Sequence, residues 1–228
     1  MKYYTYKLDL LIMNILAVVL MTFLMILTCF ITKSVDFIDK INVFTFVCLF
    51  FWCFLHELLH GIGFIILGKV NKKNIVFGVE LEKGIFYCMC KEKVTKANIL
   101  IALLFPVVFI GIFTYLIGIY FGSTLLIILS ILNISCAIGD LLMALDICLM
   151  PNDIFYIDLD DTTSFTILSK NDLSKNKYFS IILNKHGKYN DSIRAKDYTK
   201  LKISKGSKYF IVFFIILFMI SILGVLGS

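Results

Sequence analysis

Charged residues are scarce in this sequence. Lysine, arginine, aspartate and glutamate make up 17% of its 228 residues, against about 25% in a typical soluble domain. Proline and glycine are also few, at 2 and 13 residues, which argues against collagen-like and proline-rich chains. Hydrophobic residues reach 60% and the mean hydropathy is +0.92, so the composition disfavours both an ordinary soluble enzyme and a disordered chain.

The hydrophobic residues gather in blocks, and a block of about 20 residues can cross a bilayer as a helix. We therefore predict an all-α membrane protein with five transmembrane helices, set in the lipid bilayer of the cell membrane. The first block exceeds the apolar region of a cleaved signal peptide, about 7–15 residues, so we expect it to stay in the protein. The five blocks are Leu10–Thr32, Val43–Gly68, Ala97–Gly122, Thr124–Met150 and Tyr209–Gly227.

The remaining segments divide the chain into four predicted units. Residues 1–42 hold the first transmembrane helix and an external loop, and residues 43–150 form a three-helix core. Within that core, alternating residues on both sides of a turn predict a β-hairpin at 72–91. Residues 151–208 are polar with short β-favouring runs and are predicted to form a small cytoplasmic β-rich segment, while residues 209–228 hold the last helix.

Basic residues lie almost entirely on one side of the predicted bilayer. The N-terminus and the segments 69–96 and 151–208 hold 20 of the 22 lysine and arginine residues, which places them in the cytoplasm by the positive-inside rule. The N-terminus is then cytoplasmic and the C-terminus external. Contact with anionic lipid accounts for these basic segments, and because they contain no nucleic-acid-binding motif we expect no nucleic acid partner.

The second block contains His56-Glu57-Leu58-Leu59-His60, which has the pattern H-E-x-x-H. On a helix, His56 and His60 lie on one face, where both imidazoles can bind one Zn²⁺, and Glu57 is near enough to serve as general base. Zinc lowers the pKa of water to about 7, and a carboxylate then takes the proton. The chain has only 3 histidines, and shuffling its composition gives this pattern in on the order of one sequence in 2,000.

A zinc site needs a third protein ligand, and helix depth favours Asp140. Asp140 lies about 16 Å from the cytoplasmic end of the fourth block, between the depths of His60 and His56, at about 12 and 18 Å. Asp146 lies about 8 Å from that end on another face, and is predicted to be a helix-end residue whose carboxylate reaches the interface. His186 falls in the polar cytoplasmic segment and is predicted to be a solvated loop residue.

Asn133 lies seven residues before Asp140 on the same face of the fourth block. Its amide is a candidate for hydrogen bonding to a substrate backbone or to a ligand carboxylate, and equally for holding two helices together. Gly61, Gly63 and Gly139 flank the proposed ligands and permit close approach of another helix, although plain helix packing would also explain them. Pro106 lies within the third block, where it can kink the helix and open space beside the metal.

These residues resemble two related patterns. The segment from His56 to Gly61, with Asn133 to Asp140 further along, resembles a bacterial membrane family of zincin peptidases over about residues 43–161. The order of helix, hairpin, helix and helix is also similar to site-2 proteases, which are intramembrane zinc metalloproteases. In that group the third ligand is an aspartate followed by glycine, whereas here Gly139 precedes Asp140. The resemblance implies that His56, His60 and Asp140 bind zinc and that Glu57 is catalytic.

The leading hypothesis from the sequence is a membrane-embedded zinc metalloprotease that hydrolyses peptide bonds of membrane protein or peptide substrates through a zinc-activated water. The hairpin could pair with an extended substrate strand. The alternative is a non-catalytic metal or proton transporter, or a membrane scaffold, that uses the same buried polar residues. Five blocks without an evident inverted repeat make a complete transporter the less natural interpretation.

Overall fold

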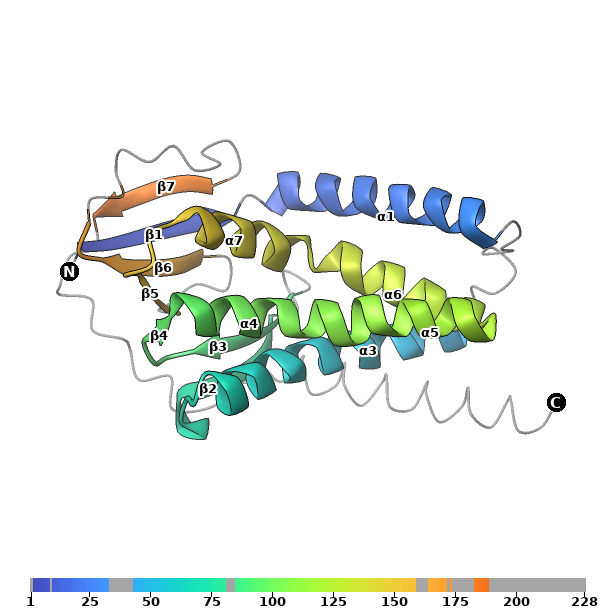
Figure 1. Cartoon of the computed structure of the whole chain (residues 1–228), viewed down its shortest axis with the longest axis horizontal. Coiled ribbons are helices and arrows are strands. Elements are labelled where there is room, and N and C mark those ends of the chain that lie inside the picture. Colours follow the sequence, from blue (N-terminus) through green and yellow to red (C-terminus); the bar gives the residue numbers. More distant parts are fainter. Residues whose placement is uncertain are drawn as a thin grey trace.

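A computed structural model describes residues 2–8, 10–32, 43–80, 85–158, 164–171, 173 and 183–188. The molecule is elongated, with apolar helices side by side along its long axis and a sheet at one end (Figure 1). The described part is thus mostly helical with two small sheets, in agreement with the predicted apolar helices, hairpin and β-rich segment, while the number of five transmembrane helices stays a prediction. The turn of the hairpin and the fifth block, Tyr209–Gly227, lie outside the described residues.

Three helices are long and apolar enough to cross a membrane among the residues that the structure describes. The first is α1, Leu10–Thr32. The second is α3, Val43–Ile62, which continues into the π-helical η1, Gly63–Leu67. The third runs through α4, Lys96–Pro106, the π-helical η3, Val107–Phe113, and α5, Thr114–Phe121. Large apolar side chains stay exposed on them, as Phe30 does at 80%, which suits lipid contact and suggests membrane association.

The fourth apolar block is not the single helix that we predicted. It consists of α6, Thr124–Cys136, and α7, Ile138–Leu149, which are bent by 49° relative to each other, so the pair makes at most a fourth, broken span. At Ala137 the backbone leaves the helical region (φ −76°, ψ 12°). The block begins as expected, because Gly122 ends α5 in the left-handed conformation (φ 66°) that glycine adopts without strain.

The larger sheet has five strands in the order β4-β5-β6-β1-β7, and every neighbouring pair is antiparallel. Strands β5, β6 and β7 belong to the predicted β-rich segment. We did not predict β1, which lies between β6 and β7, so the start of the chain shares a sheet with that segment. The strands are β1 Lys2–Leu8, β4 Val94–Thr95, β5 Phe155–Ile157, β6 Ser164–Ser169 and β7 Leu183–Lys188.

The predicted hairpin is confirmed as β2, Ile75–Glu80, and β3, Ile85–Cys90, after the short helix η2, Lys72–Asn74. It folds back against α3 instead of projecting from it (Figure 1). The rings of Phe86 in β3 and Phe50 in α3 are 5.5 Å apart, and Phe50 precedes His56 by six residues. The hairpin therefore reaches the level of the H-E-x-x-H motif.

The main hydrophobic core lies between the larger sheet and the ends of α4 and α7. It includes Ile99 and Ala102 of α4, Ile147 of α7 and Ile167 of β6, none of which is exposed. Each Å² of apolar surface that such side chains bury stabilises the fold by about 25 cal/mol. This burial holds the end of α4 against the sheet. The core thus holds Ala102 rigidly at the position where α4 meets the candidate site.

Candidate metal centre

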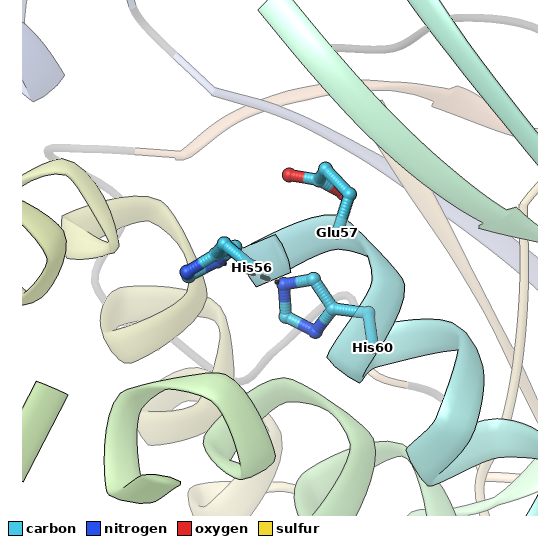
Figure 2. A group of neighbouring side chains, drawn as sticks. All are labelled: His56, Glu57 and His60. Carbon is cyan, nitrogen blue, oxygen red and sulfur yellow. Dashed lines mark hydrogen bonds between the residues drawn. The ribbon is translucent and has the colours of Figure 1, made fainter. Parts of the chain in front are cut away.

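Two histidines one helical turn apart on α3 turn their rings toward a common point. His56 and His60 are both buried, and their Nε2 atoms lie 3.0 Å apart (Figure 2). This is the arrangement predicted from the spacing of four residues, because side chains at i and i+4 lie on one helix face. The motif is therefore organised as a metal-binding pair.

Asp140 joins this pair from the first turn of α7. Its Oδ2 lies 3.0 Å from His56 Nε2 and 3.4 Å from His60 Nε2, so three ligand atoms form a triangle with edges of 3.0 to 3.4 Å. Bond lengths of about 2.0–2.1 Å in a tetrahedral zinc site imply an edge of roughly 3.3 Å. The structure thus brings together the three residues that the sequence predicted as ligands; their role in binding zinc stays a prediction.

The outer nitrogen of each histidine ring has its own partner. His56 Nδ1 lies 2.9 Å from Asn133 Oδ1, and His60 Nδ1 lies 2.8 Å from the backbone oxygen of Ala102. Because these oxygens can only accept, each Nδ1 carries the proton, and in the neutral ring each Nε2 presents a lone pair. Two nitrogen lone pairs and a carboxylate oxygen then converge on one point. These three electron-rich atoms repel one another unless a cation lies between them, and they are of the types that bind zinc.

Glu57 points from the helix to one side of the two rings (Figure 2). One ligand atom each of His56, Glu57 and His60 lie within 4.8 Å of one another, so Glu57 is a second candidate for the third ligand. We favour Asp140, because its Oδ2 is near both Nε2 atoms while the Glu57 carboxylate accepts a hydrogen bond from the backbone N–H of Cys88 in β3. Glu57 is thus left beside the site, as a general base must be.

The side chain of Asn133 is engaged with a ligand histidine. It is 5% exposed, and its Oδ1 contacts His56 while its Nδ2 has no hydrogen-bond partner in the described part of the chain. That nitrogen faces Gly111 of η3, where a Cβ atom would lie 3.3 Å from it. Asn133 therefore orients His56, a role that we had not assigned, and its contact with a substrate stays a prediction.

Asp146 does not lie at an interface as we predicted. It is 1% exposed, and neither carboxylate oxygen has a hydrogen-bond partner among the described residues. The prediction was wrong because α7 packs against other helices, among them α4 and α1, and its Asp146 side chain is covered by protein. A buried carboxyl group without partners opposes folding.

The two glycines after the motif allow close packing around it. A Cβ atom on Gly63 would lie 3.1 Å from the Cα of Ala102, and one on Gly61 would overlap the ring of Phe77 in β2. The close helix approach that we predicted is confirmed for Gly63, which lets α4 reach the site. At Gly61 the element that comes close is the hairpin and not a helix. Sequence reasoning missed two backbone groups of the site, the Ala102 carbonyl and the Cys88 amide, because a backbone atom leaves no residue-type signal.

The apolar helices and the clustered His–Glu–His group are features of a membrane-associated protein with a candidate metal centre. Residues 49–155, slightly less than half of the chain, match the model of a family described as "Putative zincin peptidase". This match supports a metallopeptidase of the zincin type and implies zinc as the metal. No curated protein and no solved structure gives a match to the chain. The relationship to site-2 proteases stays a prediction.

Proposed function

We propose that the protein is a membrane-embedded zinc metalloprotease that cleaves membrane protein or peptide substrates. The observation that carries this proposal is the convergence of His56 Nε2, His60 Nε2 and Asp140 Oδ2 at 3.0 to 3.4 Å, beside the carboxyl group of Glu57. The similarity of residues 49–155 to zincin peptidases supports it independently. The intramembrane location is proposed because the motif lies within an apolar helix, Phe44–Leu67.

In this proposal His56, His60 and Asp140 would hold the zinc ion, and Glu57 acts as general base and then as general acid. When bound, zinc would acidify water and polarise the scissile carbonyl group. The Glu57 carboxylate takes a proton from the attacking water and then donates it to the nitrogen of the leaving amine. Asn133 and the Ala102 carbonyl keep both imidazole rings in the required orientation.

The outer edge of β3 is the proposed binding position for the substrate backbone. The N–H and C=O of Cys90 point away from β2, since both are hydrogen-bonded to Asp158. Alternation in an antiparallel pair sends the same groups of Cys88 and Phe86 to that outer side. The Cys90 groups are taken by Asp158 and the Cys88 N–H by Glu57, so an extended substrate segment could pair with the C=O of Cys88 and the backbone of Phe86. Unpaired backbone in a bilayer is costly enough to favour such pairing.

The decisive experiment replaces the general base while preserving the ligands. The Glu57→Gln variant should bind zinc as wild type does but lose cleavage by at least about 100-fold, the lower range of general acid–base contributions. Expressed in cells and purified with its bound proteins, it should enrich uncleaved membrane proteins relative to wild type. Mass spectrometry of both purifications measures this enrichment.

Glu92→Gln is the matched control for that experiment. Glu92 accepts hydrogen bonds from Asn71 and Asn74 in the loop before the hairpin, and glutamine can still accept them. This variant should keep both zinc and cleavage. Continued cleavage by Glu57→Gln would refute the protease mechanism, and metal or proton flux through the wild-type protein in liposomes would support the transporter alternative instead.

A further inference from the structure

The hydrogen bond that orients His60 depends on an unusual backbone carbonyl. In an α-helix the oxygen of residue i accepts from the N–H of residue i+4. For Ala102 that residue is Pro106, which has no N–H, so the oxygen has no helical donor at that position. His60 Nδ1 lies 2.8 Å from this oxygen.

The next amide along the chain does not compensate for the missing donor. The N–H of Val107 donates to the oxygen of Leu104, and the chain then continues as the π-helical η3. The Ala102 oxygen is therefore available to a side chain from another helix. Helices around a proline often use such side chains to satisfy the freed carbonyl.

The contact between α3 and α4 at this point is close and dry. Gly63 lies three residues after His60 and packs directly on Ala102. A Cβ atom on Gly63 would be only 3.1 Å from the Cα of Ala102. His60 is 6% exposed and Ala102 is 0% exposed. Water is thus excluded from the carbonyl, so His60 Nδ1 is the partner that satisfies it.

We propose that Pro106 is a positioning residue for the metal centre. By leaving the Ala102 carbonyl without a helical donor, it holds His60 as the tautomer with the proton on Nδ1 and aims Nε2 at His56 and Asp140. The metal part of this inference rests on the proposed function. The tautomer part does not, because it concerns a hydrogen bond within the chain.

The test is the Pro106→Ala variant, with Pro151→Ala as the matched control. Alanine restores an N–H that competes for the Ala102 oxygen, so the zinc affinity, measured by competition with a chelator, should fall about 10-fold, as for loss of an outer partner of a ligand histidine. Pro151 lies just after α7, and its replacement should change the affinity less than twofold. An unchanged affinity in Pro106→Ala, or an equal loss in both variants, would overturn the proposal.

A spectroscopic measurement separates this role from a purely structural one. In metal-free protein with ¹⁵N-labelled histidine, the ring signals of His60, assigned by their absence from His60→Gln, should show the proton on Nδ1. In Pro106→Ala the population with the proton on Nε2 should rise, and in Pro151→Ala it should not. If Pro106→Ala fails to fold, the wild-type spectrum decides alone, since a neutral His60 ring with its proton on Nε2 and none on Nδ1 contradicts the proposal. Neither readout requires proteolysis, so the outcome is independent of the Glu57 experiment.

Discussion

Each histidine of the candidate centre uses both ring nitrogens, and the two rings use different kinds of acceptor. His56 is hydrogen-bonded to the side-chain amide of Asn133 in α6, and His60 to the backbone carbonyl of Ala102 in α4. With Asp140 from α7, the centre therefore depends on four helices even though its motif occupies a single one. A ligand held on both sides loses little further freedom when it binds a metal, which favours affinity.

At the residue scale, the two aspartates of α7 offer a direct comparison. Asp140→Asn should weaken zinc binding by more than the roughly 10–100-fold that an outer partner contributes, because a neutral amide replaces a ligating carboxylate. Asp146→Asn should leave zinc binding unchanged and should raise the melting temperature, since the buried carboxyl has no partner among the described residues. Chelator competition and thermal unfolding in detergent measure the two effects. Retention of full affinity by Asp140→Asn would remove it from the centre.

The candidate ligands were predictable because each carries its own signal. His56 and His60 are set by local spacing, and Asp140 is distinguished from Asp146 by its depth in the helix. The carbonyl of Ala102 could not be predicted from its own residue type. Its indirect signal was Pro106, a proline within an apolar helix, which we had connected with a kink and not with a hydrogen-bond acceptor.

At the scale of elements, the bend between α6 and α7 places Asp140 in the first turn of a helix. The N-terminal end of a helix carries partial positive charge, which favours a carboxylate there. The sequence did not predict the bend because the apolar block contains no proline, and Asp140, three residues after Ala137, was interpreted as a metal ligand. After the bend, α7 packs against α4.

Lys96 fixes the other end of α7 against α4. Its Nζ donates to the backbone oxygens of Cys148 and Met150, at 2.9 and 2.6 Å, where the last carbonyls of the helix have no helical partner. Lys96→Met should lower the free energy of unfolding by about 1–2 kcal/mol, because these oxygens lose a charged donor. Lys93→Met, at an exposed position just before β4, is the control and should have little effect. Equal stabilities in denaturant titrations would contradict this role.

The strand β1 was missed because its structure depends on distant partners. Its residues favour a strand locally, but a single short strand is not stable alone. It pairs on both edges with segments more than 150 residues further along the chain. The hairpin was predictable because its two strands are adjacent in sequence.

At the scale of the whole molecule, Asp158 connects the larger sheet to the hairpin. It directly follows β5, and its buried carboxylate accepts hydrogen bonds from the Tyr156 hydroxyl and, at 2.8 Å, from the N–H of Cys90. Its own N–H donates to the Cys90 oxygen at 3.0 Å. Because β3 also contacts Glu57 through Cys88, the sheet, the hairpin and the proposed general base form one connected unit.

This connection predicts a pH dependence of stability. Burial raises the pKa of Asp158 from 3.8 to about 6, although the hydrogen bonds from Tyr156 and Cys90 act to lower it. A folded-state pKa above the unfolded value means that the stability contribution is complete below about pH 4 and is lost as the pH rises through about 6. The loss amounts to about 3 kcal/mol.

Unfolding of wild type and Asp158→Asn in detergent between about pH 4 and pH 7 measures this effect. The stability of wild type should fall relative to the variant as the pH rises. Tyr156→Phe removes a hydrogen bond that lowers the pKa of Asp158, so its transition should move to higher pH. A stability difference between wild type and Asp158→Asn that is independent of pH would exclude Asp158 as the titrating group.

The position of β1 between β6 and β7 also dictates an order of assembly. During synthesis the residues of β1 emerge first, yet Tyr4 meets Ile167 and Leu173 only after all the helices described between them have been made. Closing so long a loop is slow compared with forming a helix or a hairpin. The sheet therefore closes after the described helices, α1 and α3 to α7, have formed.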